Sequence, residues 1–204
     1  LKLYGQEANN DDIYIFTDEY QKVADANRSA LYDVEGDDCI NAAAVTSACF
    51  IDLNDGAASQ IGLSEFLIAE NVFIEDVFTG DGNDFITGNE KKNSLNSGRG
   101  NDRFIASGGD DYIDGGFGYD EIIYDANYTD FELLQVGNLW NLVDLRSTDI
   151  DLHYGRETFK SIEKLVFNDQ DYELNLTNSK PVLATPIPDL SYGSDVIFDY
   201  TFDS

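Results

Sequence analysis

The clearest pattern in the chain is an apolar residue that recurs every nine residues across residues 79–123, with no insertion. It occupies the eighth position of five successive units, as Ile86, Leu95, Phe104, Ile113 and Ile122. A single apolar side chain between polar neighbours indicates a short strand with one inward position. The remainder of each unit is rich in glycine, Asp and Asn, which favour turns. Each unit therefore predicts a turn and a short strand, and two units predict one coil of a flattened helix.

The sixth position of every unit holds an oxygen donor, namely Asp84, Asn93, Asp102, Asp111 and Asp120. Units two apart share an edge, so Asp84, Asp102 and Asp120 should form one ladder, which Asp120 ends. The second ladder should contain Asn93 and Asp111 and extend back to Glu75. Calcium prefers such oxygens, and glycine turns bring backbone carbonyls close to an ion. We expect calcium between stacked turns. The alternative, surface turns without metal, does not explain five units in phase.

Strand-like runs flank the repeats at residues 13–16, 50–53, 65–78 (as two short strands), 131–136, 139–145 and 164–167. The runs within 124–176 are expected to close the far end of the stack and to hide its exposed edge. Residues 1–5 are expected to be the end of a helix that stops at Gly5. The predicted fold class is all-β: a right-handed parallel β-roll of nonapeptide repeats flanked by strands, a solenoid that resembles a β-sandwich.

Three regions are expected along the chain. Residues 1–176 form the roll domain, and residues 177–188 form a linker that holds all three prolines. Residues 189–204 are either the start of a following domain or a strand added to the roll. The chain begins without methionine or a signal peptide, so we expect a piece of a longer protein.

Charge narrows the choice of partners. The net charge is −28, from 40 acidic and 12 basic residues, which argues against nucleic acid and anionic membranes as partners. No apolar run reaches the roughly 18 residues of a membrane span, so membrane insertion is not expected. The 13 Phe and 12 Tyr indicate a packed core rather than disorder. Stacked carboxylates repel one another, so folding should be coupled to cation binding.

The two cysteines, Cys39 and Cys49, flank a segment that we expect to be a strand, a turn and a strand, which would bring them together as a disulfide. The alternative is two small buried thiols. Two cysteines and one histidine, His153, give no zinc pattern, and a lone histidine in a strand is usually structural.

The nonapeptide matches the calcium-binding repeat of RTX proteins. From residue 1 to about residue 123, the chain also resembles the C-terminal domain of the serralysin family of secreted zinc proteases. Outside the repeats, the segments that carry the resemblance are LKLYG (1–5), DIYIF (12–16), DVEGDD (33–38), IDLNDG (51–56) and FIED (73–76). The first resembles the end of the last helix of the protease domain. The third resembles a calcium loop, with Glu35 in place of its first glycine.

The resemblance implies about five calcium ions. A first site would use Ala8, Asn10, Asp12, Asp33, Glu35, Gly36 and Asp38. A second would use Phe73, Glu75, Asn89, Lys91 and Asn93, with Lys91 offering only its carbonyl. The remaining sites would use the turns and carboxylates of the later units: Gly80, Asp81, Gly82, Asp84, Ser97, Gly98, Arg99, Gly100, Asp102, Ala106, Gly108, Gly109, Asp111, Gly115, Gly116, Phe117, Gly118 and Asp120. Thr79, Ser97, Ala106 and Ser107 replace glycines, which predicts a different turn in the fourth unit.

A serralysin protease needs the zinc motif H-E-x-x-H-x-x-G-x-x-H, and His153 is the only histidine here. The chain by itself is therefore expected to be no enzyme. The resemblance implies a secreted, non-catalytic calcium module that assists folding, stability and secretion of neighbouring domains in a metalloprotease. The alternative is a binding or spacer module of a large extracellular adhesin or polysaccharide-acting protein, with a glycan or cell-surface ligand. It is motivated by residues 178–189, which resemble the opening of a cadherin- or immunoglobulin-like domain.

Calcium removal is the first test. Carboxylates on neighbouring coils lie about 5 Å apart and repel by roughly 1 kcal/mol per pair in a water-like dielectric. We expect chelation to loosen at least residues 79–123 and returned calcium to restore them, as seen by circular dichroism and thermal melts. An unchanged spectrum and melting temperature after complete chelation would contradict this.

Overall fold

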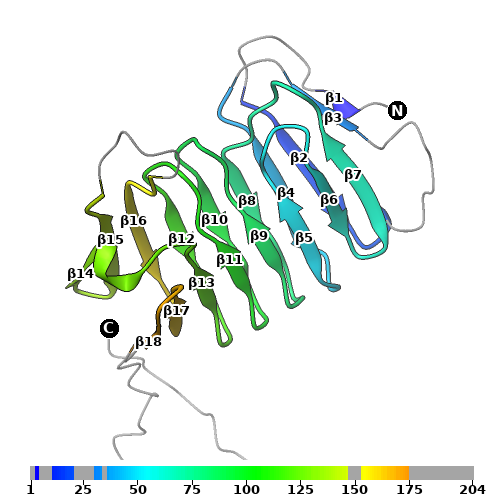
Figure 1. The fold of residues 1–204 in the computed structure, drawn as a ribbon. Helices are drawn as coiled ribbons and strands as arrows, with labels where there is room; N and C mark the ends of the chain where they lie inside the picture. Colours follow the sequence, from blue (N-terminus) through cyan, green and yellow to red (C-terminus); the bar gives the residue numbers. More distant parts are fainter. Residues whose placement is uncertain (1–2, 5–10, 21–29, 34–35, 147–152, 175–204) are drawn as a thin grey trace, which may run out of the picture.

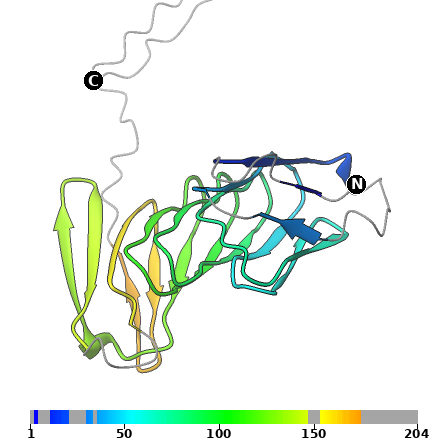
Figure 2. The ribbon, with the colours of Figure 1, turned by 90° about the horizontal axis from the view of Figure 1, so that it is seen from above.

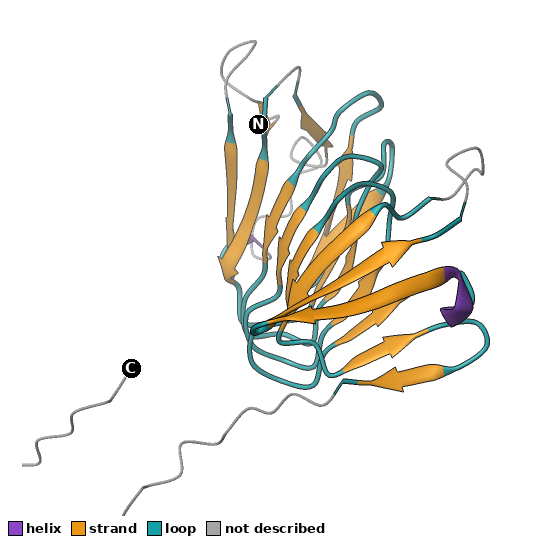
Figure 3. Cartoon of the chain, turned by 90° about the vertical axis from the view of Figure 1, so that its left-hand side faces the viewer, coloured by secondary structure: helices purple, strands orange, loops and turns teal. Residues whose placement is uncertain are grey.

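The computed structural model describes residues 3–4, 11–20, 30–33, 36–146 and 153–174. The chain winds into two facing layers of strands that are joined by turns at both edges (Figures 1 and 3). The all-β roll predicted from the repeats is confirmed. The expected linker at 177–188 and the tail at 189–204 lie outside the described residues.

One layer is a ten-stranded sheet. Its strands, in spatial order, are β1 (Leu3–Tyr4), β3 (Ala30–Tyr32), β7 (Ser64–Ile68), β6 (Ala58–Ile61), β5 (Cys49–Asp52), β9 (Phe85–Thr87), β11 (Arg103–Ile105), β13 (Glu121–Ile123), β17 (Lys164–Val166) and β18 (Asp171–Glu173). The pairs from β5 through β9, β11 and β13 to β17 are parallel. The β5–β6–β7 meander and the β17–β18 pair are antiparallel.

The other layer is an eight-stranded sheet. Its strands, in spatial order, are β14 (Phe131–Val136), β15 (Leu139–Asp144), β16 (Arg156–Lys160), β12 (Tyr112–Asp114), β10 (Ser94–Asn96), β8 (Asp76–Phe78), β4 (Cys39–Ala44) and β2 (Ile13–Thr17). From β8 to β13 the chain alternates between the two sheets at every strand. One nonapeptide therefore supplies one strand, and two supply one coil.

The eighth position of each repeat points inward, as predicted. Ile86, Phe104 and Ile122 stack in register within one sheet, and Leu95 and Ile113 stack in the other. All five side chains are at most 1% exposed. Burying one such side chain contributes about 1.5–3 kcal/mol, so this single inward residue is the main apolar contribution of each short strand.

The roll continues beyond the repeats without their glycine pattern. β16 pairs in parallel with β12, and β17 pairs in parallel with β13, so the two strands form one more coil. The β14–β15 hairpin, preceded by the short helical turn η3 (Tyr128–Asp130), is inserted before this coil and pairs antiparallel with β16 (Figures 2 and 3). The strands expected after the repeats are thus present. They both lengthen the stack and cover its last parallel strands.

An aromatic cluster fills the closing end of the roll. The Tyr124 ring lies 5.1 Å from that of Phe167 and 5.4 Å from that of Tyr154, and Phe131 packs against all three. All four residues are largely buried. This packing joins the end of the last repeat to the final coil.

Two expectations about the first half of the chain are wrong. Within residues 1–5, Leu3–Tyr4 is a strand paired in parallel with β3, not the end of a helix. Cys39 and Cys49 are free, buried thiols, not a disulfide. The strands that they begin, β4 and β5, belong to different sheets. Successive strands of one coil begin at opposite edges of the roll. A disulfide between Cys39 and Cys49 would instead need β4 and β5 to pair with each other as a hairpin. Burial raises the pKa of Cys39 to about 11 and that of Cys49 to about 12.

Within the described part of the chain, no helix has the length and apolar character needed to span a membrane.

Candidate metal centres

Three buried carboxylates form a ladder along one edge of the roll. The Asp84 N–H donates to Asp102 Oδ1 at 2.7 Å, and the Asp102 N–H donates to Asp120 Oδ1 at 2.8 Å. All three residues are at most 2% exposed. The stacking predicted from their spacing of eighteen residues is confirmed.

This ladder is longer than the repeats. The Cys49 N–H donates to Asp84 Oδ1 at 2.8 Å, and the Asp120 N–H donates to Glu163 Oε2 at 2.7 Å. The expectation that Asp120 ends the ladder is therefore wrong. The parallel pairing of β13 with β17 places Glu163 where another repeat would place its Asp.

One oxygen of each repeat carboxylate on this edge has no partner. Oδ2 of Asp84, Asp102 and Asp120 is buried and makes no hydrogen bond. No ion pair in the described part of the chain reaches these three groups. Burial raises the pKa of Asp84 to about 6 and that of Asp120 to about 7. A buried, unneutralised carboxylate is costly, and an oxygen-seeking cation is a partner that fits.

The turns at this edge are stacked closely enough to share an ion. The Arg99 N–H donates to the Gly80 carbonyl, and the Phe117 N–H donates to the Gly98 carbonyl, both at 2.8 Å. Gly118 has φ +154°, and a Cβ there would collide with the carbonyl oxygen of Gly100. The predicted turn donors on this edge all belong to these stacked turns: Gly80, Asp81, Gly82, Ser97, Gly98, Arg99, Gly100, Gly115, Gly116, Phe117 and Gly118.

The side chains at the third position of these turns point away from the edge. Arg99 and Asp81 form an exposed ion pair at 3.0 Å, and Phe117 is 76% exposed. Arg99 and Phe117 could offer an ion only their carbonyls. The hydroxyls that replace glycine bond along the stack instead, from Thr79 to the Ser97 carbonyl and from Ser97 to the Gly115 carbonyl.

The second ladder begins earlier than predicted. The Asp12 N–H donates to Asp38 Oδ1, and the Asp38 N–H donates to Glu75 Oε2, each at 2.8 Å. After the repeats begin, the Asn93 N–H donates to Asp111 Oδ1 at 2.8 Å. The parallel register of β2, β4, β8, β10 and β12 aligns these residues.

Part of the first predicted site is assembled at the start of this ladder. Carboxylate oxygens of Asp12, Asp33 and Asp38 lie within 4.8 Å of one another. The Tyr14 hydroxyl donates to Asp33, and burial raises the pKa of Asp38 to about 6. Gly36 lies in the same loop with φ +156°. The other predicted donors, Ala8, Asn10 and Glu35, lie outside the described residues.

The second predicted site differs in its hydrogen bonding. Asn93 Oδ1 accepts the Asn89 N–H at 2.8 Å, and the two side-chain amides donate to the carbonyls of Ile74 and Glu75. The Lys91 ammonium lies 4.4 Å over the Phe73 ring, away from these donors. Amide N–H groups therefore already bond carbonyls that a cation would use, and this ligand set stays a prediction.

The fourth repeat turn contains Ala106, Gly108 and Gly109, and its serine supports the carboxylate of the ladder. Ser107 Oγ donates to Asp111 Oδ2 at 3.1 Å. Burial raises the pKa of Asp111 to about 7. The next residue at this edge is Glu157, because Tyr112 pairs with Thr158.

Sequence reasoning missed Glu157 and Glu163. A faint signal exists for Glu157, because Gly155, Glu157 and Phe159 repeat the spacing of the fourth, sixth and eighth positions of a nonapeptide. Glu163 has no such signal, since its turn is shorter than a repeat turn. His153 is structural, and its Nδ1 accepts the Gly155 N–H at 3.1 Å.

The family model described as Peptidase M10 serralysin C terminal matches residues 2–180. No curated protein matches the chain.

The extended ladder changes the expected effect of Asp→Ala variants. The sequence alone predicts that Asp102→Ala is more damaging than Asp120→Ala, because Asp120 would be terminal. In the structure each change leaves a buried N–H without its acceptor, so both should cost about 1–3 kcal/mol beyond any loss of calcium. Thermal melts in calcium measure this, with Glu132→Ala on the exposed face of β14 as the control. A loss at Asp120 no larger than the control would contradict a stabilising hydrogen bond from the Asp102 N–H to Asp120.

The raised pKa values predict opposite pH profiles with and without calcium. Burial raises the pKa of Asp84 to about 6 and those of Asp111 and Asp120 to about 7, so protonation favours the metal-free fold. This contribution is complete below about pH 4 and is lost as the pH rises through 6 and 7. We expect the melting temperature of metal-free protein to fall across that window, and added calcium to remove or reverse the fall. If the melting temperature of the metal-free protein rises from pH 4 to 7, the raised pKa values of these three carboxylates are refuted.

Proposed function

The chain belongs to the family of M10 peptidase serralysin C-terminal domains, and from this premise we propose that it is a calcium-binding, non-catalytic module of a secreted metalloprotease. Its role is to fold as calcium binds and so to stabilise the domains beside it and support their secretion. The zinc chemistry of such a protease would belong to another part of the polypeptide.

The observation that carries this proposal is the row of unpartnered oxygens of Asp84, Asp102 and Asp120. Each carboxylate is held in place through Oδ1 by a backbone N–H, so that Oδ2 is free to bind an ion. Calcium takes six to eight oxygens from carboxylates and carbonyls, and these edges supply both kinds. The Asp12, Asp33 and Asp38 cluster supports the same proposal for the first site.

The coupling of folding to calcium suits a protein exported from the cell. Extracellular calcium modules work at about 10⁻⁴–10⁻³ M, a concentration far above that of the cytosol. At low calcium, the mutual repulsion of the carboxylates opposes the roll. At high calcium, the ion binds only the folded form and raises its stability. The module would therefore fold after export.

The alternative, a binding module, is supported by a groove on the outer face of the ten-stranded sheet. The groove has a volume of about 420 Å³ and is lined by Phe50, Phe85, Tyr119, Asn83, Asn101, Asp102 and the ion pair of Arg103 with Glu121. Aromatic faces beside amide groups suit a neutral glycan more than an anionic one on so acidic a chain. A glycan array probed with the calcium-loaded chain tests this alternative. If no glycan on the array binds the chain, the groove no longer supports a binding module.

Ion counting tests the main proposal. Equilibrium dialysis against calcium should show about five ions bound per chain, with binding and the gain of β-sheet signal following the same calcium dependence. Asp102→Asn, which keeps the shape of the side chain and removes its charge, should lower both the ion count and the melting temperature in calcium. Glu132→Gln is the matched control. A folded chain that binds no calcium would refute the proposal.

A further inference from the structure

One carboxylate in the final coil is buried with no partner at all. Glu157 in β16 is 1% exposed, and both of its carboxylate oxygens lack a hydrogen bond. Among the described residues it is the only carboxylate with both oxygens in this state. Asp84, Asp102 and Asp120 have one such oxygen each, whereas both oxygens of Asp111 accept hydrogen bonds. A carboxylate this deeply buried needs a neutralising partner.

The turn that carries Glu157 has the geometry of a repeat turn. Gly155 has φ +71° and stands two residues before Glu157, just as Gly109, at φ +116°, stands two residues before Asp111. A Cβ at Gly155 would collide with the Gly109 carbonyl oxygen, so the two turns are in backbone contact.

A hydrogen bond between the turns supports the same stacking. The Arg156 N–H donates to Asp110 Oδ1 at 2.9 Å, as the Tyr119 N–H donates to Asn101 Oδ1 at 3.0 Å between two repeats. Residues 153–157 thus stack on residues 107–111 as one repeat turn stacks on another.

Two further oxygen donors lie at the same end of the roll as Glu157. Asp111 occupies the neighbouring position of the ladder, and the Tyr124 hydroxyl is also buried without a partner. The Tyr124 ring contacts that of Tyr154 at 5.4 Å, and Tyr154 stands three residues before Glu157. Carboxylates, a hydroxyl and turn carbonyls are the ligands of a hard cation.

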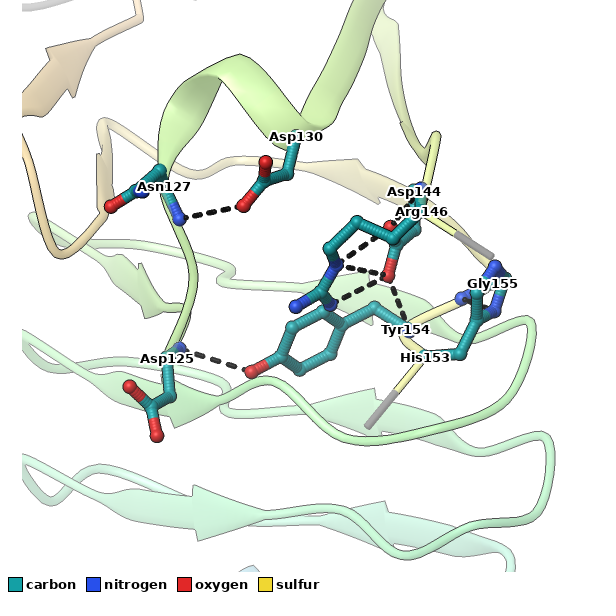
Figure 4. A network of polar contacts seen from close by, with 8 residues as sticks. All are labelled: Asp125, Asn127, Asp130, Asp144, Arg146, His153, Tyr154 and Gly155. Carbon is teal, nitrogen blue, oxygen red and sulfur yellow. Dashed lines mark hydrogen bonds and ion pairs between the residues drawn. The ribbon is translucent and has the colours of Figure 1, made fainter. Parts of the chain in front are cut away.

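The nearby arginine is already engaged elsewhere. Arg146 forms an ion pair with Asp144 at 2.7 Å, and Asp144 Oδ2 also accepts the Tyr154 N–H at 3.0 Å (Figure 4). The Tyr154 hydroxyl accepts the Asp125 N–H at 3.0 Å (Figure 4). This network fixes the turn in place without neutralising Glu157.

We propose that Glu157 and Asp111 bind a further calcium ion between the turns 107–111 and 153–157, outside the nonapeptide repeats. The site rests on the calcium binding proposed above but uses a carboxylate that the repeats do not supply. The Tyr124 hydroxyl and turn carbonyls complete the oxygen shell. The ion clamps the closing coil onto the last turn of the repeats on that edge.

Trp140, the only tryptophan of the chain, makes this site separately observable. Trp140 pairs with Phe159 across β15 and β16, and Glu157 lies two residues before Phe159 on the same face. Such diagonal neighbours are about 7–8 Å apart. Terbium, which replaces calcium, should therefore luminesce when Trp140 alone is excited, at a wavelength that tyrosine does not absorb.

We expect tryptophan-sensitised terbium emission in the wild-type chain, with calcium competing for the site. Glu157→Gln should weaken terbium binding at this site about tenfold or more and lower the number of bound calcium ions by one. Glu132→Gln, on neighbouring β14, should leave both readings unchanged. Asp102→Asn, at the opposite edge, should lower the ion count but not the tryptophan-sensitised emission.

Two results would overturn the proposal while calcium still binds elsewhere. One is a wild-type chain that binds terbium without tryptophan-sensitised emission, a reading that does not depend on whether any variant folds. The other is a folded Glu157→Gln chain with unchanged emission and ion count. A chain that binds neither ion anywhere would instead refute the proposed function, and this site with it.

Discussion

The whole roll depends on how stacked, buried carboxylates are neutralised. Hydrogen bonds from backbone N–H groups hold one oxygen of each ladder carboxylate except Glu157, and these bonds run from coil to coil along both edges. They leave the negative charges in line at the spacing of β-strands, where each neighbouring pair repels by about 1 kcal/mol even in a water-like dielectric. One inward side chain per strand contributes about 1.5–3 kcal/mol, which must offset both this repulsion and the conformational entropy lost when the turns become ordered. In the function proposed above, a bound cation would reverse the balance, because it would turn the same carboxylates into shared ligands.

The distribution of basic residues reinforces this dependence. The described ion pairs lie at outward positions, such as Arg103 with Glu121 and Lys164 with Asp171. Exposed pairs of this kind contribute little to stability. The exception, Arg146 with buried Asp144, holds the closing turn. Within the described residues, no ion pair therefore neutralises the ladder carboxylates of the repeats, where metal ions would act instead.

The closing coil shows which features of a repeat the architecture needs. β16 and β17 lack the glycine-rich signature, yet each keeps an inward apolar residue, Phe159 or Leu165, and a glutamate at the ladder position. Glu163 accepts the Asp120 N–H as an Asp would, from a turn that is shorter than a repeat turn. Glu163 therefore continues the ladder without a glycine-rich turn, whereas Glu157 has the register but accepts no hydrogen bond. Glycine is required where two turns approach backbone to backbone, as at Gly155.

The sequence by itself determined the part of the fold that is local and periodic. The nine-residue spacing was enough to predict the inward residues, such as Phe104, and the ladder of Asp84, Asp102 and Asp120, because one repeat fixes its neighbour. Only the tertiary structure decided the features that depend on which distant strands become neighbours. The pairing of β12 with β16 brings Glu157 to Asp111, and that of β13 with β17 brings Glu163 to Asp120 across insertions of different length. The same holds for the cysteines, which are ten residues apart in the chain but begin strands in opposite sheets. Strand pairing between non-adjacent segments is set by the burial of the whole core, and no local pattern records it.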